Sequence, residues 1–423
     1  MIKLFKSSLR GSLKAPPSKS ASHRQLIAAA LSKNGGLMEL ESLSDDISAT
    51  MDCLAQLGAG FEIEGRYIKI SPIDLNSGFS KTYFFNAGDS GSTLRFVMPV
   101  AQALAKEAVY TGTSQLARRP FWPAIAALAS GGVRFSNESF PIAAHGRFCA
   151  DSVYVQTDIS SQFLSGFLLA APLLKNGLTV KTNGIIVSKP YADMTINVMR
   201  DFNMGVLEEN GVFIVKSGDY ISPPLIETEG DFSAAAFFLV SAVISSGSGI
   251  TVSGLDVNSA QADKKIFDIL SACGADIAAD KASGEISARS SHVKPFETDI
   301  TDCPDLFPPL CALAAGASGV SKISGAKRLT LKESNRLKSC CLLINALGGK
   351  AETADDAIII HGKGGLTGGT AKAFADHRIA MTAAVCSLIS ETPVILTGEN
   401  CVSKSYPAFF EDFAHLGGKL CHL

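Results

Sequence analysis

The stretch Cys53-Leu54-Ala55-Gln56-Leu57-Gly58-Ala59 decides the fold, because it recurs along the chain. It reads as the end of an amphipathic helix, a glycine that terminates the helix, and a small residue before a strand with alternating apolar positions. The marker glycines of the six copies follow one another at intervals of roughly seventy residues, and they are Gly58, Gly132, Gly205, Gly274, Gly348 and Gly417. Six similar units are therefore predicted.

A unit of this length exceeds a solenoid repeat, so each can be a small α/β module with two helices and several strands. The modules divide into two groups of three, and prolines and acidic residues interrupt the pattern at 222–231. We predict two domains, residues 14–228 and residues 1–13 with 229–423, joined by two hinge crossings. If the first dozen residues pair with the C-terminal half, one crossing lies at Pro16-Pro17.

The composition indicates an ordered globular protein whose anionic partners are small. Of the 423 residues, 46% are hydrophobic and 18% are charged. The 38 basic and 40 acidic residues leave a net charge of −2, which gives no overall attraction to nucleic acid or to an acidic membrane. The longest apolar runs, near 163–174 and 234–244, are too short to span a bilayer and read as buried helices.

Cysteine usage and the N-terminus point to the cytoplasm. Ten scattered cysteines form no Cys-x-x-Cys pair, and no histidines cluster at the spacing of metal ligands. We therefore expect reduced thiols and no metal. The first residues, Met1–Lys6, lack the apolar stretch and cleavage site of a signal peptide, so we expect a protein that is not secreted.

The segment Pro16-Pro17-Ser18-Lys19-Ser20-Ala21-Ser22-His23-Arg24 places cations where a turn enters an apolar helix. Ser18 or Ser20 can cap this helix, and its first amides attract an anion. Lys19 adds a point charge and Arg24 a planar fork, which suit phosphate or carboxylate. An ordinary capped helix with solvated basic residues is the alternative. The recurrence of similar clusters disfavours it.

Five further segments carry charge beside a turn or a helix start, and they are 86–95, 117–120, 302–305, 331–336 and 376–378. The glycine-bearing turn of the first can bring backbone amides against an anion. Pro120 suits the first position of a helix. Lys332 and Arg336 are spaced to share one helical face. Each segment alone is also explained by a capped helix or by solvated, salt-bridged side chains.

Together with shorter motifs, these segments form one ordered pattern from residue 16 to residue 404. The motifs are Pro17-Ser18-Lys19-Ser20, Arg119-Pro120, Ser160-Ser161-Gln162-Phe163, Ser188-Lys189-Pro190-Tyr191, Pro304-Asp305, Lys332-Glu333-Ser334-x-Arg336, Asp376-His377-Arg378 and Lys404. The pattern closely resembles the 5-enolpyruvylshikimate-3-phosphate synthase family. This resemblance implies an α/β fold of two similar domains, each of three βαβαββ units, which is the inside-out α/β barrel of enolpyruvyl transferases.

The resemblance implies a transferase of the shikimate pathway, which leads to chorismate and the aromatic amino acids. The enolpyruvyl group of phosphoenolpyruvate would pass to the 5-hydroxyl of shikimate 3-phosphate with release of phosphate. The family does this by addition and elimination, through a tetrahedral intermediate in a closed cleft between the domains. The partners would be these two small molecules, with no nucleic acid, membrane, metal or organic cofactor, and the family's usual form is a monomer.

The matching motif positions supply the expected site residues. Shikimate 3-phosphate would contact Lys19, Ser20, Arg24, Ser160, Ser161, Gln162, Ser188, Tyr191, Asp305 and Lys332. Phosphoenolpyruvate would contact Lys19, Gly91, Arg119, Gln162, Arg336, Arg378 and Lys404. The resemblance implies Asp305 as the base for the 5-hydroxyl and Glu333 for proton exchange at the methylene carbon, with Lys19 supporting either step.

The chain departs from the family pattern at three positions, where Asp89 replaces an asparagine and Thr330 and Asn335 replace an arginine and an aspartate. Gly91 is the position where an alanine weakens glyphosate inhibition in the family, so we expect glyphosate sensitivity. Two alternatives remain. One is the related transferase acting on UDP-N-acetylglucosamine, which carries a reactive cysteine near 114–117, where this chain has none. The other is a non-catalytic anion-binding relative, which would require a lost acid or cation.

Overall fold

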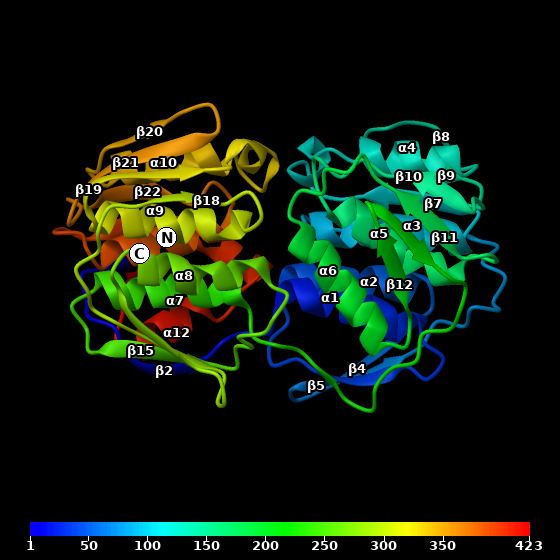
Figure 1. The fold of residues 1–423 in the computed structure, drawn as a ribbon, viewed down its shortest axis with the longest axis horizontal. Coiled ribbons are helices and arrows are strands. Elements are labelled where there is room, and N and C mark those ends of the chain that lie inside the picture. Colours follow the sequence, from blue (N-terminus) through cyan, green and yellow to red (C-terminus); the bar gives the residue numbers. More distant parts are fainter. The chain divides into compact units, whose positions relative to one another are not determined.

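The computed structural model describes all 423 residues, and the chain divides into two compact units. Unit 1 consists of Met1–Pro16 and Glu229–Leu423, and unit 2 consists of Pro17–Thr228. The chain therefore passes between the units twice. The first two strands, β1 (Ile2–Phe5) and β2 (Arg10–Lys14), pair with strands of the C-terminal half, which is the pairing considered from the sequence (Figure 1).

Six four-stranded sheets, three in each unit, share one strand order. In each sheet an edge strand pairs in parallel with its neighbour, and the other two strands continue the sheet by antiparallel pairing. Unit 2 contains the sheets β14-β3-β5-β4, β6-β7-β9-β8 and β10-β11-β13-β12. Unit 1 contains the sheets β16-β17-β15-β2, β18-β19-β21-β20 and β22-β23-β1-β24. The repeated order confirms the prediction of six similar units.

The strands are short and lie at corresponding places in the six repeats. In unit 2 they are β3 (Gly36–Glu39), β4 (Gly60–Glu64), β5 (Tyr67–Ser71), β6 (Thr82–Asn86), β7 (Glu107–Thr111), β8 (Arg134–Phe135), β9 (Ile142–His145), β10 (Ser152–Tyr154), β11 (Leu178–Lys181), β12 (Val206–Glu209), β13 (Val212–Val215) and β14 (Ile226–Glu227). In unit 1 they are β1, β2, β15 (Gly249–Ser253), β16 (Asp276–Asp280), β17 (Glu285–Arg289), β18 (Glu297–Asp299), β19 (Ser318–Ser324), β20 (Ala351–Thr353), β21 (Ala357–Lys363), β22 (Gly369–Lys372), β23 (Val394–Thr397) and β24 (Lys419–His422).

Two kinds of helix alternate along the chain. The first helix of each repeat is buried along nearly its whole length, and these helices are α1 (Lys19–Leu31), α3 (Gly91–Leu104), α5 (Gln162–Ala170), α7 (Phe232–Ile244), α9 (Phe307–Gly316) and α11 (His377–Ser387). The second helix exposes one face, and these helices are α2 (Asp45–Gln56), α4 (Trp122–Ser130), α6 (Lys189–Asp201), α8 (Lys265–Ala272), α10 (Arg336–Ala346) and α12 (Phe409–His415). No helix has the length and apolar character that crossing a membrane requires.

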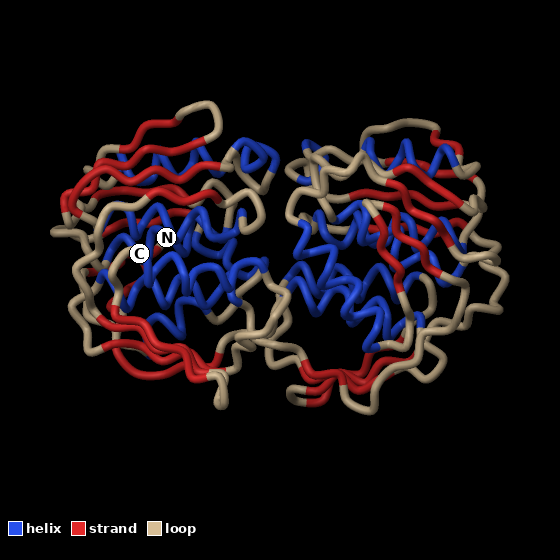
Figure 2. The backbone as a smooth tube through the Cα atoms, viewed as in Figure 1, coloured by secondary structure: helices blue, strands red, loops and turns tan.

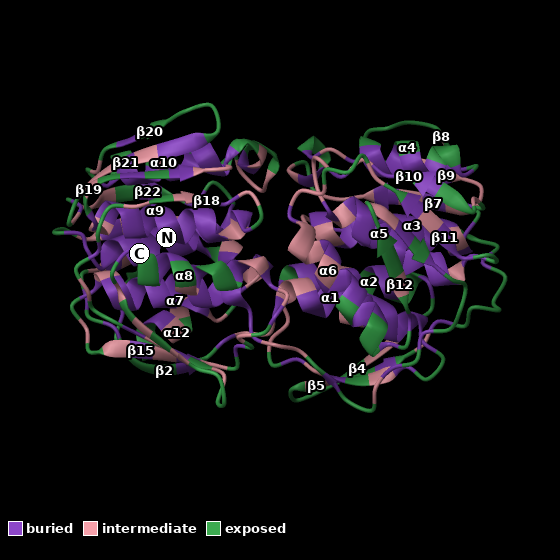
Figure 3. Cartoon of the chain, viewed as in Figure 1, coloured by how far each residue is buried: buried purple, intermediate pink, exposed green.

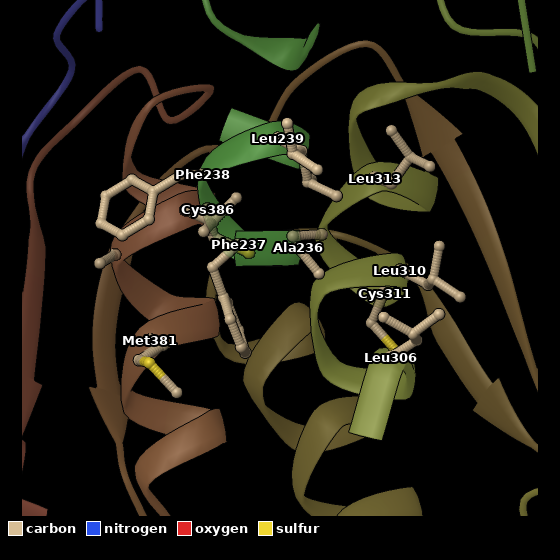
Figure 4. Packing of buried hydrophobic residues seen from close by; sticks show 14 of the residues in the cluster. Ala236, Phe237, Phe238, Leu239, Leu306, Leu310, Cys311, Leu313, Met381 and Cys386 are labelled. Carbon is tan, nitrogen blue, oxygen red and sulfur yellow. The ribbon is translucent and has the colours of Figure 1, made fainter. Parts of the chain in front are cut away.

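The buried helices lie inside each unit and the sheets lie outside them. A helix that is apolar on all sides must be covered on all sides, and in each unit the strands surround the helices (Figures 2 and 3). In unit 1 the helices α7, α9 and α11 pack directly on one another through side chains that include Phe237, Leu310 and Met381 (Figure 4). This arrangement is the inside-out α/β barrel that the sequence predicts.

Most helices begin and end at the capping residues and glycines that the sequence indicates, but α6 does not end at its predicted glycine. Ser18 and Ser90 accept hydrogen bonds from the amides of Ala21 and Thr93 at the starts of α1 and α3. Five of the six predicted marker glycines have the positive φ of a helix C-terminus. After α6 that conformation belongs to Asn203, with φ 66°, and not to the predicted Gly205. Asparagine tolerates the left-handed region better than other side chains.

Two predicted helix starts are wrong. Helix α4 begins at Trp122 after Phe121, so Pro120 precedes the helix instead of opening it. Arg336 is the first residue of α10, and Lys332 lies in the loop after the 3-10 helix η5 (Lys327–Leu331), so the two do not share a helical face. The reason is Asn335, whose side chain caps α10 by accepting a hydrogen bond from the amide of Lys338 at 3.1 Å.

Close packing of α5 on α3 makes Gly166 sensitive to substitution. A Cβ atom at this position would lie 2.3 Å from the carbonyl oxygen of Arg95 and 3.1 Å from Cγ of Pro99. We expect Gly166→Ala to lower the free energy of unfolding by about 1–3 kcal/mol, because the backbones must separate. Gly205→Ala, where a Cβ meets nothing within 4 Å, should change it by less than about 0.5 kcal/mol. Urea denaturation of both variants tests this, and equal effects would contradict it.

Candidate active-site clusters

Several of the expected site residues lie at or near the N-terminal ends of the buried helices. Lys19, Gly91 and Gln162 are the first residues of α1, α3 and α5. Asp305 lies in the 3-10 helix η4 (Pro304–Leu306) that runs into α9, and Arg378 lies in the first turn of α11. The unpaired amides at these helix ends carry partial positive charge, which favours bound anions.

In unit 1, Arg336 is surrounded by three carboxylates. Its Nη1 lies 2.6 Å from Oδ1 of Asp305, its Nη2 lies 2.6 Å from Oε2 of Glu333, and its Nε lies 2.9 Å from Oδ2 of Asp376. The side chain is only 1% exposed. Burial opposes its charge, but Asp376, Glu333 and Asp305 together raise the pKa of Arg336 well above its ordinary value. We call Asp305, Lys332, Glu333, Arg336, Asp376 and Arg378 the unit 1 cluster.

Asp376 organises this cluster. Its Oδ2 accepts hydrogen bonds from the amide and the hydroxyl of Ser334 at 3.3 and 3.0 Å, in addition to the contact with Arg336. Its Oδ1 accepts the amide of Arg378 at 3.0 Å and so caps α11. One fully buried carboxylate therefore joins the loop before α10 to the start of α11. Capping of α11, which the sequence analysis considered for this segment, is only part of the role of Asp376.

Asp305 faces three of the expected substrate-binding cations. Lys332 Nζ lies 3.4 Å from its Oδ1, Arg336 Nη1 lies 2.6 Å from the same atom, and Arg378 Nη2 lies 3.2 Å from its Oδ2. Burial alone would raise the pKa of Asp305, but Arg378, Lys332 and Arg336 outweigh it and hold this pKa well below its ordinary value. The carboxylate of Asp305 thus supplies the negative charge that these three cations contact. Because its pKa is low, Asp305 is a weak base in this arrangement.

Two further cations of the unit 1 cluster have shifted pKa values in opposite directions. Burial lowers the pKa of Lys332, although Asp305 partly compensates. Burial also acts against the charge of Arg378, but Asp305 more than compensates and raises the pKa of Arg378. Lys404 is buried at the end of the 3-10 helix η6 (Glu399–Lys404), which packs on α11.

In unit 2, Lys19 pairs with Asp46 of α2, whose Oδ2 lies 2.7 Å from the lysine Nζ. Asp46 is buried at 3% exposure. Its backbone oxygen accepts a hydrogen bond from Thr93 Oγ1 at 3.2 Å, and the hydroxyls of Thr93 and Thr50 lie 2.6 Å apart. This network ties the ends of α1, α2 and α3 together and fixes the ammonium group of Lys19.

Arg24 is held by neutral oxygens instead of carboxylates. Its Nε donates to Thr195 Oγ1 at 2.7 Å, and its Nη1 and Nη2 donate to the carbonyl oxygens of Ser20 and Tyr191 at 2.5 and 2.9 Å. Burial lowers the pKa of Arg24 to about 9, so the side chain is still charged at neutral pH. Its role as a substrate ligand stays a prediction, and these contacts favour a role in placing Ser20 and Tyr191.

Two guanidinium groups converge on Gly91. An ideal Cβ at this glycine would lie 2.8 Å from Nη1 of Arg119 and 3.3 Å from Nη1 of Arg95. Arg95 also donates to Oε1 of Gln162 at 2.8 Å, and Nε2 of Gln162 donates to Ser92 Oγ at 2.8 Å. The absence of a side chain at position 91 lets two cations approach the start of α3 together. We call Lys19, Arg95, Arg119 and Gln162 the unit 2 cluster.

The remaining expected residues lie at the starts of α5 and α6. Ser160 Oγ accepts a hydrogen bond from the amide of Gln162 at 3.3 Å, and the neighbouring Ser161 is buried. Ser188 precedes α6 in the left-handed conformation, with φ 53°. The amide of Tyr191 donates a hydrogen bond to the carbonyl oxygen of Ser188 at 3.1 Å. These hydroxyls and amides suit the polar oxygens of a sugar-like ring.

Sequence reasoning missed Arg95 of the unit 2 cluster, Asp46 as the partner of Lys19, and the wider role of Asp376 in the unit 1 cluster. Arg95 stands four residues after Gly91, so one turn of α3 places it beside that glycine, and this spacing was a usable signal. Asp46 and Asp376 gave no such signal. Their cationic partners lie 27 and 40 residues away in sequence. No group of three or more histidine, cysteine or carboxylate side chains is arranged to bind a metal ion.

Comparison with known proteins identifies one family. The profile of EPSP synthase (3-phosphoshikimate 1-carboxyvinyltransferase) matches residues 5–413. A 3-phosphoshikimate 1-carboxyvinyltransferase from Clostridium kluyveri is 37% identical over 97% of this chain and 96% of its own. One from Methanocorpusculum labreanum is 33% identical over 98% of each.

Solved structures show the same fold. The EPSP synthase from Acinetobacter baumannii superimposes with a TM-score of 0.83 and 23% identity over 100% of this chain and 99% of its own. The enolpyruvyl transferase NikO from Streptomyces tendae gives a TM-score of 0.77 and 15% identity over 100% and 98%. These likenesses confirm the fold class, two similar domains built from βαβαββ units.

The contacts of Asp376 predict a large stability effect. Asp376→Ala leaves the buried guanidinium of Arg336 without its fully buried partner, so we expect a loss of about 3–5 kcal/mol in the free energy of unfolding. Asp219→Ala is the matched control, because Asp219 pairs with Lys33 at 2.6 Å while both side chains are more than half exposed. This change should cost less than about 1 kcal/mol. Urea denaturation measures both, and similar losses would contradict the central role of Asp376.

Proposed function

This chain belongs to the EPSP synthase family, and we propose that its two side-chain clusters together bind shikimate 3-phosphate and phosphoenolpyruvate. The chain transfers the enolpyruvyl group of phosphoenolpyruvate to the 5-hydroxyl of shikimate 3-phosphate and releases phosphate. The observation that carries this conclusion is the family match over nearly the whole chain, together with cations placed at helix N-termini in both units. Two anionic substrates explain why the cations are divided between the units.

The two compact units are proposed to be the domains predicted at 14–228 and at 1–13 with 229–423, and to close on the substrates. Shikimate 3-phosphate is proposed to bind Ser160, Ser161 and Gln162 at the start of α5 and Ser188 and Tyr191 at the start of α6. Other contacts come from Lys19, Ser20, Arg24, Asp305 and Lys332. Phosphoenolpyruvate is proposed to bind Lys19, Gly91, Arg119, Gln162, Arg336, Arg378 and Lys404. Both proposals rest on the motif positions and on the charges described above.

Asp305 is proposed to be the base for the 5-hydroxyl, although its pKa is now held low by three cations. Phosphoenolpyruvate brings a phosphate and a carboxylate to Arg336 and Arg378, which then share their charge between Asp305 and the substrate. The pKa of Asp305 rises as a result, and its carboxylate can accept a proton. Glu333, whose Oε2 lies 2.6 Å from Arg336 Nη2, is proposed to exchange a proton with the methylene carbon. Lys19 supports charge at either step.

The related transferase acting on UDP-N-acetylglucosamine is not favoured. The similar curated proteins described above are 3-phosphoshikimate 1-carboxyvinyltransferases. Residues 114–117, which run into the 3-10 helix η1 (Leu116–Arg118), contain no cysteine that could serve as that enzyme's reactive thiol. A non-catalytic relative is also disfavoured, because every expected acid and cation is present.

Cytoplasmic location and a monomeric state complete the proposal. All ten cysteines are free thiols, which supports a reducing compartment. No observation calls for a cofactor, since the charges needed for addition and elimination come from side chains of the two clusters. The small-molecule substrates are the only partners that the reaction requires.

A phosphate-release assay tests the activity. The purified chain should release phosphate from phosphoenolpyruvate with shikimate 3-phosphate as acceptor and should release none with UDP-N-acetylglucosamine. Asp305→Asn keeps the shape of the side chain but cannot accept the proton, so we expect the turnover number to fall by about a hundredfold or more. The dissociation constant for shikimate 3-phosphate should change far less. An unchanged turnover number in this variant would reject the role of Asp305.

Gly91→Ala should weaken phosphoenolpyruvate binding, because the added Cβ would lie 2.8 Å from Nη1 of Arg119. We expect the KM for phosphoenolpyruvate to rise by about 10- to 100-fold, while the KM for shikimate 3-phosphate stays within about twofold. Glyphosate should inhibit the unaltered chain and inhibit this variant less. Gly205→Ala, with open space at the Cβ position, is the control. Equal changes in both KM values would show that the substitution acts on the fold instead.

A further inference from the structure

Asp263 is a buried acid to which the proposed reaction assigns no role. It lies in the 3-10 helix η3 (Ala262–Lys264), between β15 and α8, and is 1% exposed. The hydroxyl of Ser233, in the first turn of α7, donates a hydrogen bond to its Oδ2. Its Oδ1 is buried and accepts no hydrogen bond from the protein. Burying a carboxylate oxygen without a donor is costly, so this position requires an explanation.

Helix capping does not explain Asp263. The start of α7 is already capped by Asp231, whose Oδ1 accepts the amide of Ala234 at 3.0 Å. Gln261 Oε1 accepts the amide of Phe232 at 3.0 Å, and Gln261 Nε2 donates to the carbonyl oxygen of Gly230 at 2.8 Å. The helix end and the turn are thus satisfied without the carboxylate of Asp263.

The charged groups around Asp263 belong mainly to the unit 1 cluster. Asp231, the N-cap of α7, and Asp305 of η4 act on it with negative charge, and Arg378 of α11 acts on it with positive charge. Burial, and after it the charge of Asp263, raises the pKa of the Cys303 thiol. The lysines that follow it point elsewhere. Lys264 Nζ donates to the carbonyl oxygen of Ser259 at 2.6 Å, and Lys265 Nζ donates to that of Asp299 at 2.8 Å. Arg378 is therefore the cation whose charge acts on the carboxyl group of Asp263.

Arg378 also has a buried polar atom without a hydrogen-bond partner. Its Nη2 contacts Asp305 at 3.2 Å, but its Nε is buried and donates to no protein atom. The positive charge of Arg378 acts against the burial that raises the pKa of Asp263. The negative charge of Asp263 adds to those of Asp305 and Asp231, which raise the pKa of Arg378 against its burial. The two groups are thus electrostatically coupled without being hydrogen-bonded. Ionisation of Asp263 strengthens the attraction between them.

We propose that Asp263 is a positioning residue that sets how strongly Arg378 attracts phosphoenolpyruvate. When Asp263 is a neutral acid, the guanidinium of Arg378 interacts with Asp305 and the substrate without competition from Asp263. As a carboxylate, Asp263 draws the guanidinium toward itself and adds a negative charge near the anion. This inference rests on the proposed function, because it takes Arg378 as a ligand of phosphoenolpyruvate.

The titration of Asp263 falls in the range where this control can operate. Burial, followed by the charge of Asp305, raises the pKa of Asp263 to about 7. Binding of an anion next to Arg378 disfavours the ionised form further, so phosphoenolpyruvate binding takes up a proton at this site. Affinity for phosphoenolpyruvate then falls as the pH rises through the pKa, because the favourable neutral form is lost.

The test is the pH dependence of kcat/KM for phosphoenolpyruvate in the full-length enzyme. We expect this constant to fall about tenfold between about pH 6 and about pH 8 in the unaltered chain, through KM and with little change in kcat. Asp263→Asn, which stays neutral, should lose this fall. The substrate phosphate ionises near pH 6 in every variant, so the ratio of variant to unaltered chain isolates the protein group.

Ser233→Ala gives an independent signature. The hydrogen bond from Ser233 lowers the pKa of Asp263, so its removal should move the fall in kcat/KM to higher pH without abolishing it. A purely structural role of Asp263 would not produce this shift. Asp268→Asn changes an exposed acid on the neighbouring α8 and should leave the profile unaltered.

The outcomes separate the two claims. No phosphate release by the unaltered chain would reject the proposed function itself. An active enzyme whose profile lacks the fall near pH 7, or keeps it in Asp263→Asn, would overturn the inference about Asp263 alone. If Asp263→Asn does not fold, the Ser233→Ala profile decides, and an unshifted profile there also overturns the inference.

Discussion

Six buried helices impose the constraint on which the other features depend. Each is covered on nearly every side, so the sheets lie outside the helices, and the helix bodies contribute mainly apolar packing. The few polar side chains within them, such as Arg24 and Arg95, are hydrogen-bonded inside the unit. Polar chemistry is left to the helix ends, where unpaired amides require partners. Polar and charged motif residues of this chain occur there, at Lys19, Gln162, Asp305 and Arg378. The same constraint therefore explains both the architecture and the location of the candidate site.

The buried arginines near these helix ends are stabilised in two different ways. Arg24 donates to hydroxyl and carbonyl oxygens, which hold its side chain in place. Arg336 and Arg378 are instead balanced by carboxylates, and Asp305 bridges both. A bridging carboxylate keeps cations together without substrate, and an arriving anion can take its place beside them. The low pKa of Asp305 thus follows from its three cationic neighbours, and an anion that shares those cations would raise it, as the proposed role of Asp305 as a base requires.

How well each part of the site could be predicted depends on how far apart in the sequence the interacting residues lie. The family motifs gave Lys19, Gln162 and Asp305 as expected site residues, and in the structure these residues lie at or just before helix starts. The partners Asp46 and Asp376 were missed, since each contacts a cation on another helix. The cap at Asn335 also overrode the helical spacing of Lys332 and Arg336 by starting α10 later than expected.

For the fold, local patterns were enough to reveal six repeats, the buried helices and most helix ends, because capping and hydrophobic periodicity act within one or two turns. They did not reveal that β14 completes the sheet of β3, or that β1 lies between β23 and β24. Nor did they show which acid meets which cation. Strand pairing and buried ion pairing depend on which surfaces meet after folding, since both gain their strength from groups distant in the chain and from the exclusion of water around them.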